Sequence, residues 1–489
     1  MIRILFLVIL CCQFLIISSQ SIRPSEYCGT SKSCQKKMLE NAALDPIVHQ
    51  DHQTTIYLPL QVHNVGDDGG KYYFDIVGVY DALCRVNKDF EPTGVQFFLE
   101  SEINYIGKTS WNNHPDYSDG EDMMHQNNFS NRINCYLVAN PAGNCGYYTY
   151  SGDAIALSKN CISPSQHTWA HELGHYFSLP HTFFGWEGLT YDSKKTTSDW
   201  QKDVFTEIED LSKSNCNQQA DNFCDTPPDY LSYRWNCNSR NVSGVTQTDI
   251  HGNYFNSDGT LFMSYSNDGC SSRFSDEQNQ KMLSNIENRR RYLTRPDVKP
   301  VFIEEDSFAN LLPLDSAILP HKKLIFSWDS VENAKQYIFK IARSKNMKFE
   351  LQTIITSTNF ISIDTLVPGR TYYWSMRAVN DFDFCGIQTK LFTLQTKSIT
   401  DLGQSQSIDE ISVYPNPVQI DQSIRVTFGK KLVENISLYN LSGIKVDLGN
   451  KIIREEQFAK VQLVNIPKGI YFLHVNTSTG KTIKKLIIQ

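Results

Sequence analysis

Residues 171–181 read HELGHYFSLPH, and this stretch predicts both the fold and the chemistry of the first half of the chain. Side chains four positions apart share one face of a helix, so His171 and His175 can bind one metal ion together. Glu172 lies one position round that helix and can reach a water molecule on the metal. A proline then ends the helix, and the following turn can bring in His181 as a third ligand. Three imidazoles with one open position are typical of catalytic zinc, whereas structural zinc has four protein ligands.

Chance is a weak explanation of this motif. The chain has 12 histidines in 489 residues. At that content, a random His-Glu-x-x-His is expected in roughly one such chain in a hundred. A pair of surface histidines on an ordinary helix is therefore the weaker alternative. The stronger alternative is a metal site that was once catalytic and has lost its activity, and Ser178 is the residue that supports this alternative.

Composition limits the class of protein. A chain of 489 residues is too long for one core. The net charge of −7 is small and no basic stripe is present, so we do not expect nucleic acid as a partner. Residues 1–20 read as a signal peptide, with Arg3 before an apolar core. No later segment approaches the roughly 18 apolar residues of a membrane helix. The sequence therefore predicts an exported protein with no transmembrane segment after signal removal.

The cysteines agree with export. Of the 13 cysteines, two lie in the signal peptide, which leaves eleven. Seven of these lie between residues 135 and 270 and flank the histidine motif, as in a domain held by disulfides in an oxidising compartment. Their pairing cannot be read from the sequence. Because eleven is odd, at least one thiol is free or pairs outside the chain.

The order of the predicted elements indicates an α/β sandwich. An amphipathic helix is expected over residues 74–88, and the motif helix is expected to open at 163–164. Short strands are expected at 56–62, 95–99, 135–138 and 154–157. Residues 185–260 are loop-rich, and helical spacing returns over 274–293.

The C-terminal half has the alternating pattern of β-sandwiches. Residues 366–374, LVPGRTYYW, resemble part of a fibronectin type III module, and the resemblance covers 300–397 with Trp328 in the place of its core tryptophan. Residues 408–489 carry YPNP at 414–417, LYNLSG at 438–443, GIYF at 469–472 and KKLIIQ at 484–489. This ordered set closely resembles the C-terminal sorting domain of the type IX secretion system.

That second resemblance implies a partner and a location. Type IX secretion machinery would carry the chain across the outer membrane of a Gram-negative bacterium, after which the sorting domain is removed. We therefore expect a secreted product, and release or attachment to the bacterial outer surface are both open. The alternative is a binding or structural sandwich.

Further motifs near the histidines narrow the family. LFMSY at 261–265, CDTP at 224–227 and HTF at 181–183 together resemble the pappalysin family of metzincin zinc peptidases. The predicted fold is therefore multidomain, an α/β (α+β) metzincin-like zinc peptidase domain followed by two all-β sandwich domains. The segments are a signal peptide (1–20), a propeptide (21–52), the peptidase domain (53–296), the fibronectin type III-like domain (300–397) and the sorting domain (408–489).

The pappalysin resemblance implies roles for individual residues. It assigns the zinc ligands to His171, His175 and His181. It makes Glu172 the general base that takes a proton from the attacking water, a role that a carboxylate beside zinc can fill. It places Tyr265 where its hydroxyl can stabilise the oxyanion. Met263 would form the floor of the site and would not bind the metal.

The same resemblance suggests a calcium site. Asp221 and Thr226 fall at the spacing of a calcium-binding loop, together with the main-chain carbonyls of Ala220 and Cys224. Oxygen ligands suit calcium. The alternative, of equal weight, is that Asp221 and Asp225 only cap turns.

Two more residues bear on specificity and latency. Asp268 matches an acidic residue that gives some members a preference for Arg or Lys just after the scissile bond; a surface aspartate is the alternative. Cys28, in Tyr-Cys-Gly-Thr, resembles a switch in which a propeptide thiolate takes the open zinc position. A local disulfide with Cys34 is the competing interpretation.

One position departs from the family. Metzincins usually have Gly where this chain has Ser178, because the backbone leaves the helix there in a conformation that Gly adopts easily. A serine in that conformation costs roughly 1 kcal/mol. We still expect a secreted zinc-dependent endopeptidase acting on proteins or peptides. The alternative is a catalytically weak or inactive adhesion protein that keeps the zinc fold.

Overall fold

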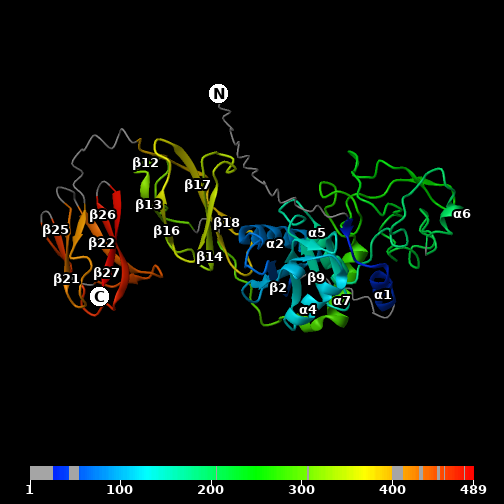
Figure 1. Cartoon of the computed structure of the whole chain (residues 1–489), viewed down its shortest axis with the longest axis horizontal. Helices are drawn as coiled ribbons and strands as arrows, with labels where there is room; N and C mark the ends of the chain where they lie inside the picture. Colours follow the sequence, from blue (N-terminus) through cyan, green and yellow to red (C-terminus); the bar gives the residue numbers. More distant parts are fainter. Residues whose placement is uncertain are drawn as a thin grey trace, which may run out of the picture. The chain divides into compact units, whose positions relative to one another are not determined.

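The computed structural model describes residues 26–42, 54–204, 206–304, 308–398, 411–428, 433–448, 452–455, 458–477 and 480–489. The predicted signal peptide lies outside the described residues, as does the end of the predicted propeptide. The chain divides into two units, Met1–Pro296 and Asp297–Gln489, which are treated separately (Figure 1).

A seven-stranded sheet forms the centre of the first unit. Its strands are β1 (Glu26–Cys28), β2 (Ile56–Gly66), β3 (Val95–Leu99), β4 (Asn104–Gly107), β6 (Ile133–Val138), β8 (Asn144–Thr149) and β9 (Ala154–Ser158). The order is β1-β8-β9-β6-β2-β3, with β4 also paired to β2. All neighbours are parallel except β8 and β9. The short strand β1, from the predicted propeptide, therefore occupies the outer edge of β8.

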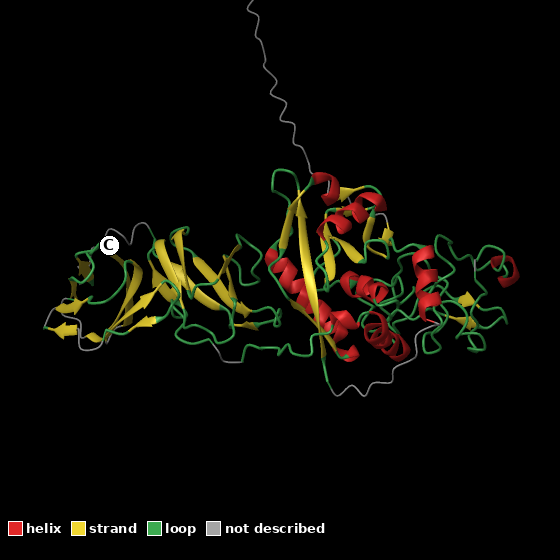
Figure 2. Ribbon diagram, turned by 90° about the horizontal axis from the view of Figure 1, so that it is seen from below, coloured by secondary structure: helices red, strands yellow, loops and turns green. Residues whose placement is uncertain are grey.

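Helices pack against this sheet (Figure 2). The amphipathic helix α2 (Ile76–Phe90) contacts β3, and the motif helix α5 (Thr168–Tyr176) contacts β8 and β9. Asp75 caps α2 by accepting a hydrogen bond from the N–H of Gly78. The remaining helices are α1 (Lys32–Ala42), α3 (Thr109–Asn112), α4 (Tyr117–Asn127), α6 (Thr197–Trp200) and α7 (Asp276–Arg289), with short 3-10 turns at Glu91–Thr93 and Arg291–Leu293.

The motif helix begins later than the sequence suggested. Residues 163–164 were expected to open it, but α5 starts at Thr168. Residues 163–166 form a turn instead, in which the N–H of Gln166 donates to the carbonyl of Ser163 at 3.1 Å, and the N–H of His167 then donates to Oδ1 of Asp268 at 3.0 Å. A partner far along the chain thus satisfies an amide at the helix start, and no local capping residue is needed.

Disulfides hold the loop-rich region. Among the described residues of 185–260 the elements are short: α6, β10 (Gln247–Thr248) and β11 (Tyr254–Phe255). The three disulfides described pair Cys145 with Cys161, Cys216 with Cys224, and Cys237 with Cys270. The expectation of a disulfide-held domain is therefore confirmed. A pair of short strands, β5 (Asn113–His114) and β7 (Asn140–Pro141), completes the unit.

The second unit consists of β-sheets. Residues 317–396 form a six-stranded sheet and a two-stranded sheet around a core that includes the buried Trp328 and Trp374. Their strands are β12 (Ala317–Leu319), β13 (Lys322–Ser327), β14 (Gln336–Ala342), β15 (Gln352–Thr356), β16 (Phe360–Thr365), β17 (Thr371–Val379), β18 (Ile387–Gln388) and β19 (Phe392–Thr396). Residues 412–488 form two four-stranded sheets around a separate core. Their strands are β20 (Ser412–Tyr414), β21 (Ser423–Thr427), β22 (Val433–Asn440), β23 (Lys445–Val446), β24 (Ile452–Arg454), β25 (Phe458–Gln462), β26 (Gly469–Thr477) and β27 (Gly480–Ile488). The predicted multidomain, strand-rich organisation is confirmed.

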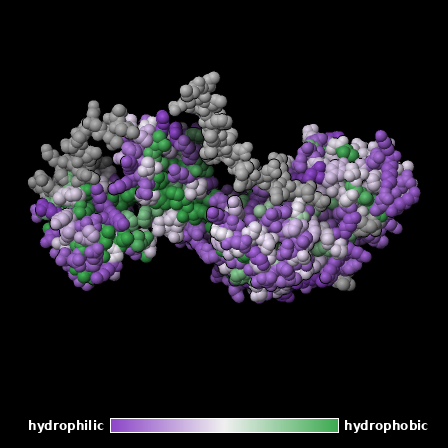
Figure 3. Space-filling view, viewed as in Figure 1, coloured by the Kyte–Doolittle hydropathy of each residue, from purple (hydrophilic) through white to green (hydrophobic). Residues whose placement is uncertain are grey.

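The surface of the first unit is mostly hydrophilic on the face that Figure 3 shows. Among the helices of the described residues, none combines the length and the apolar character needed to cross a membrane.

Candidate metal centre

Three histidine side chains converge where α5 ends. Nε2 of His175 lies 3.2 Å from Nε2 of His171 and 3.1 Å from Nε2 of His181. The Cys28 thiol lies beside them, with Sγ 3.4 Å from Nε2 of His175. The ligand atoms of these four buried residues all lie within 4.8 Å of one another. The structure therefore brings together the three predicted ligands and the predicted latency cysteine.

Hydrogen bonds fix the tautomers of two of these rings. Nδ1 of His171 lies 2.6 Å from the carbonyl oxygen of Phe262, and Nδ1 of His175 lies 2.7 Å from that of Leu179. A carbonyl only accepts, so each Nδ1 carries the proton and each Nε2 keeps a lone pair. Burial, helped by the charge of neighbouring His181, holds the pKa of both rings well below the usual value. Two neutral rings thus aim lone pairs at each other, which is favourable only around a cation.

The spacing fits a zinc ion. Typical Zn–N and Zn–S lengths in a tetrahedral site separate two nitrogens by about 3.3 Å and a nitrogen from a thiolate by about 3.6 Å. The corresponding distances here are 3.1, 3.2 and 3.4 Å. Imidazole and thiolate are also ligands that zinc prefers. His171, His175, His181 and Cys28 could therefore hold zinc in the precursor.

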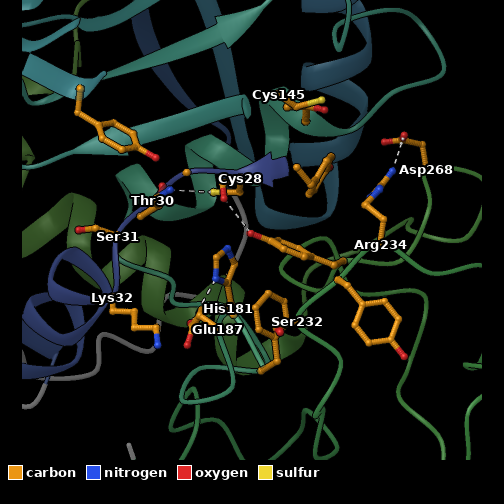
Figure 4. Close-up of a pocket in the computed structure, with 18 of the residues that line it drawn as sticks. Cys28, Thr30, Ser31, Lys32, Cys145, His181, Glu187, Ser232, Arg234 and Asp268 are labelled. Atoms are coloured by element: carbon orange, nitrogen blue, oxygen red, sulfur yellow. Dashed lines mark hydrogen bonds and ion pairs between the residues drawn. The ribbon is translucent and has the colours of Figure 1, made fainter. Parts of the chain in front are cut away.

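Two residues that sequence reasoning missed lie next to His181. Its backbone N–H donates to Oε1 of Gln35, on α1, at 2.9 Å. Its Nδ1 lies 3.5 Å from Oε1 of Glu187, longer than a normal hydrogen bond (Figure 4). Burial lowers the pKa of His181 to about 3 and raises that of Glu187 to about 7. Carboxylates beside ligating histidines are common, but no fixed spacing announces them.

Ser178 adopts the left-handed backbone that its position demands. Its φ is +73°, and the N–H of the following Leu179 returns to the carbonyl of Gly174 at 2.9 Å. Nδ2 of Asn285, on α7, donates to Oγ of Ser178 at 2.8 Å. One such hydrogen bond contributes about 1 kcal/mol, similar to the cost of the backbone conformation. The departure from glycine is thus offset by a side chain far along the chain.

Met263 and Tyr265 both lie near the histidines but make different contacts. Met263 is fully buried beneath α5, where a Cβ added at Gly174 would come within 2.5 Å of its Sδ. Gly174 therefore allows the helix to approach the methionine closely. The ring of Tyr265 lies 4.9 Å from that of His181, and its hydroxyl donates to the carbonyl of Cys28 at 3.0 Å.

The Glu172 carboxylate is buried between the propeptide and β8. Its Oε2 lies 3.6 Å from the Cys28 thiol and 3.4 Å from the Thr30 hydroxyl, and its Oε1 has no hydrogen-bond partner. A Cβ added at Gly146 of β8 would lie 2.9 Å from Oε1, so a larger residue would displace the carboxylate. Burial raises the pKa of Glu172 to about 8.

Cys28 and Cys34 are both free thiols. The competing interpretation, a local disulfide between them, is therefore not the arrangement observed. An odd number of cysteines leaves at least one thiol unpaired, and Cys28 is one such thiol, placed beside the histidines. Cys135 is a further free and buried cysteine.

Asp268 is already paired within the chain. Its Oδ2 lies 2.9 Å from Nη2 of Arg234, as Figure 4 shows. Its Oδ1 accepts the N–H of His167. The role of Asp268 in binding a substrate Arg or Lys stays a prediction. In this structure both carboxylate oxygens of Asp268 already have partners within the chain. Arg234 carried no sequence signal, since it lies 34 residues before Asp268.

The predicted calcium residues lie together. Oγ1 of Thr226 is 3.1 Å from both carboxylate oxygens of Asp221, which is buried. Burial holds the pKa of Asp221 well above its usual value. Asp225 behaves as the alternative interpretation expected, because its carboxylate accepts from the hydroxyl of Ser275 and the N–H of Glu277 at the start of α7. Asp221 also makes a turn contact, because its Oδ1 accepts the N–H of Phe223 at 3.1 Å, so the calcium site stays a prediction.

Comparison with known proteins addresses the C-terminal region. Residues 412–489 match the family described as the secretion system C-terminal sorting domain. The protein is therefore secreted. The predicted sorting domain is confirmed, and it implies interaction with the secretion machinery. No match was found among curated proteins.

Several solved structures are similar to parts of the chain. The fn3 domain of human collagen alpha-1(XX) shares 15% identity over 19% of this chain and 90% of its own, with a TM-score of 0.16. An Fn3-like protein from Clostridium thermocellum shares 20% over 19% and 93%, with a TM-score of 0.14. The N-terminal Ig1-2 module of Drosophila Receptor Protein Tyrosine Phosphatase DLAR shares 13% over 37% and 98%, with a TM-score of 0.22.

Proposed function

We propose that the protein is a secreted zinc endopeptidase of the pappalysin-like metzincin type, made as a latent precursor. The observation that carries the proposal is the convergence of the His171, His175 and His181 rings, whose Nε2 atoms approach to 3.1 and 3.2 Å. A carboxylate, Glu172, lies at the same buried centre, 3.6 Å from the thiol of Cys28. A structural zinc site has no need of such an acid.

The chemistry follows from the side chains around this centre. A bound zinc ion would supply an activated water molecule and polarise the scissile carbonyl. Glu172 would take one proton from that water and pass it to the leaving amine, while the hydroxyl joins the carbonyl carbon. Burial raises the pKa of Glu172 in the precursor, and a carboxylate beside an activated water molecule can both accept and release a proton. The Tyr265 hydroxyl would donate to the oxyanion once Cys28 has left.

Substrate and propeptide would compete for the same sheet edge. β1 pairs with β8 through Glu26 opposite Asn144 and Cys28 opposite Gly146. After removal of β1, an extended peptide can add to this edge through main-chain hydrogen bonds. The precursor is latent because Cys28 takes the position that a water molecule needs.

We also propose a calcium ion at Asp221 and Thr226. The support is a buried carboxylate whose nearest partners are neutral donors, Thr226 and the N–H of Phe223. A second buried carboxylate, Glu209, has its pKa raised to about 10 by burial and by the charge of Asp221. A divalent cation would relieve this repulsion, and oxygen ligands suit calcium.

The test combines metal content with activity on the full-length secreted protein. We expect one zinc per chain, casein cleavage that a chelator abolishes, and a loss of at least about a hundredfold in Glu172→Ala. Glu287→Ala, which removes a partly exposed carboxylate on α7, serves as the matched control. Zinc binding with equal inactivity of the native protein, the chelated protein and Glu172→Ala would favour the adhesion protein instead.

A further inference from the structure

The residue before Cys28 fills a side-chain subsite next to the metal centre. Tyr27 is only 7% exposed. It borders a cavity of about 530 Å³ that is also lined by Thr168, Arg234, Tyr265 and Asp268. β1 lies on the edge of β8 that we assign to substrate, so Tyr27 reports which side chain this subsite accepts.

The walls of the subsite favour an aromatic ring. The guanidinium carbon of Arg234 lies 3.9 Å from the centre of the Tyr27 ring, a distance at which a cation is attracted to the face of a ring. The ring also meets Tyr265 edge-to-face, with centres 5.4 Å apart and planes at 85°. His171 makes a similar contact at 5.1 Å. Aromatic pairs prefer this arrangement.

The same walls disfavour a basic side chain. Of the two acidic residues that line the cavity, Asp268 is occupied by Arg234 at 2.9 Å, and Glu187 lies beside His181, 3.5 Å from its Nδ1. Arg234 is also anchored by donation to the carbonyl oxygen of Ser266. An incoming Arg or Lys would meet the positive charge of Arg234 and would have to displace it from Asp268. Figure 4 shows the Arg234 side chain directed to Asp268 on this side of the cavity.

We propose that this subsite selects Phe or Tyr next to the scissile bond, and that Arg234 is the specificity-determining residue. The inference rests on the proposed peptidase function and refines it. It replaces selection of Arg or Lys by Asp268 with selection of an aromatic ring by Arg234. Asp268 holds Arg234 in place and so acts as a positioning residue.

The first experiment compares peptide pairs that differ only in one residue beside the scissile bond, Phe or Arg, placed directly before the bond in one pair and directly after it in the other. The activated full-length protein should cleave the Phe peptide with a kcat/KM at least about tenfold higher. Arg234→Ala frees Asp268 and should move this ratio at least about tenfold toward the Arg peptide, whereas Arg234→Lys keeps the charge and should still reject Arg. Arg343→Ala, which removes a similarly exposed arginine (25% against 29% for Arg234) from an ion pair in the second unit, is the control.

The second experiment reads the same subsite without catalysis. In the zinc-loaded precursor, alkylation of Cys28 followed by mass mapping reports how tightly β1 is held. Tyr27→Phe should react within about twofold of the native rate, and Tyr27→Arg at least about tenfold faster, because two guanidinium groups then face each other. In the Arg234→Ala background, Tyr27→Arg should protect Cys28 again by pairing with Asp268.

The outcomes separate the two proposals. Zinc-dependent cleavage that favours Arg, or that ignores this position, would overturn the aromatic subsite and leave the peptidase function standing. Absence of cleavage of either peptide would overturn the peptidase function. The subsite would then be judged by alkylation alone, where equal protection by Tyr27→Arg and Tyr27→Phe would overturn it.

Discussion

The contact between Ser178 and Asn285 predicts that the effect of Ser178→Gly on the free energy of unfolding depends on whether Asn285 is present. A left-handed backbone such as the +73° φ of Ser178 costs an L-residue about 1–2 kcal/mol. Ser178→Gly would therefore relieve about 1 kcal/mol, after allowing for the greater freedom of glycine in the unfolded chain. The same change removes the acceptor of the buried Asn285 amide. A buried donor without a partner costs about 1–3 kcal/mol.

The two contributions oppose each other, so Ser178→Gly should lower the free energy of unfolding by about 1 kcal/mol in the otherwise native chain. In the Asn285→Ala background the penalty of the unpaired Asn285 amide is absent, so Ser178→Gly should be more favourable there than in the native chain by about 1–3 kcal/mol. For a domain of this size a change of about 1 kcal/mol corresponds to a Tm shift of about 2–4 °C. Scanning calorimetry of the full-length protein measures it, in the transition that a zinc chelator also shifts.

Ser178→Ala is the control for this cycle. It keeps the backbone strain and loses the hydroxyl, so it should destabilise the native chain more than it destabilises the Asn285→Ala chain. If Ser178→Gly shifts the free energy of unfolding equally in both backgrounds, within about 0.5 kcal/mol, the compensation does not exist.

Three further predictions concern latency, calcium and acid stability. Cys28→Ala should shorten the lag before the precursor cleaves casein. Cys34→Ala removes a second free thiol of the propeptide and should leave the lag unchanged. If Cys28→Ala and the native precursor have the same lag, Cys28 is not a latency switch. Calcium should raise the Tm of the native chain but not that of Asp221→Asn. Asp225→Asn should start from a lower Tm and still respond to calcium. Thermal scans with and without a calcium chelator measure these shifts. Burial lowers the pKa of His63 to about 4 from 6.5, so the unfolded chain takes up the additional proton as pH falls from 6.5 to 4. The free energy of unfolding should drop across that window by up to about 3 kcal/mol. His63→Gln should flatten the profile of Tm against pH, and an unchanged slope would contradict this assignment.

Much of the first unit was predictable because its signals are local. The strand expected at 95–99 is β3 (Val95–Leu99), and the helix expected over 74–88 is α2 (Ile76–Phe90). Residues four apart on one helix must share a face, so the pairing of His171 with His175 needed no tertiary information.

The propeptide shows where such reasoning ends. β1 and α1 lie in residues 21–52, where no strong periodicity was visible, because three strand residues and one helix derive their order from contact with the rest of the unit. The role of Asp268 likewise depended on Arg234, and that of Ser178 on Asn285. Each pair joins residues far apart in sequence, and no spacing rule predicts such a partner.

The contact between Gln35 and His181 bears on how the metal is retained. α1 belongs to the segment predicted to be removed, so maturation takes away two supports together, the Cys28 thiol and the amide oxygen that holds the backbone of His181. The mature form would be the looser chelate and would exchange its ion faster than the precursor. The inhibitory segment would thus also serve as an assembly aid, keeping the ion in place during export until activity is needed.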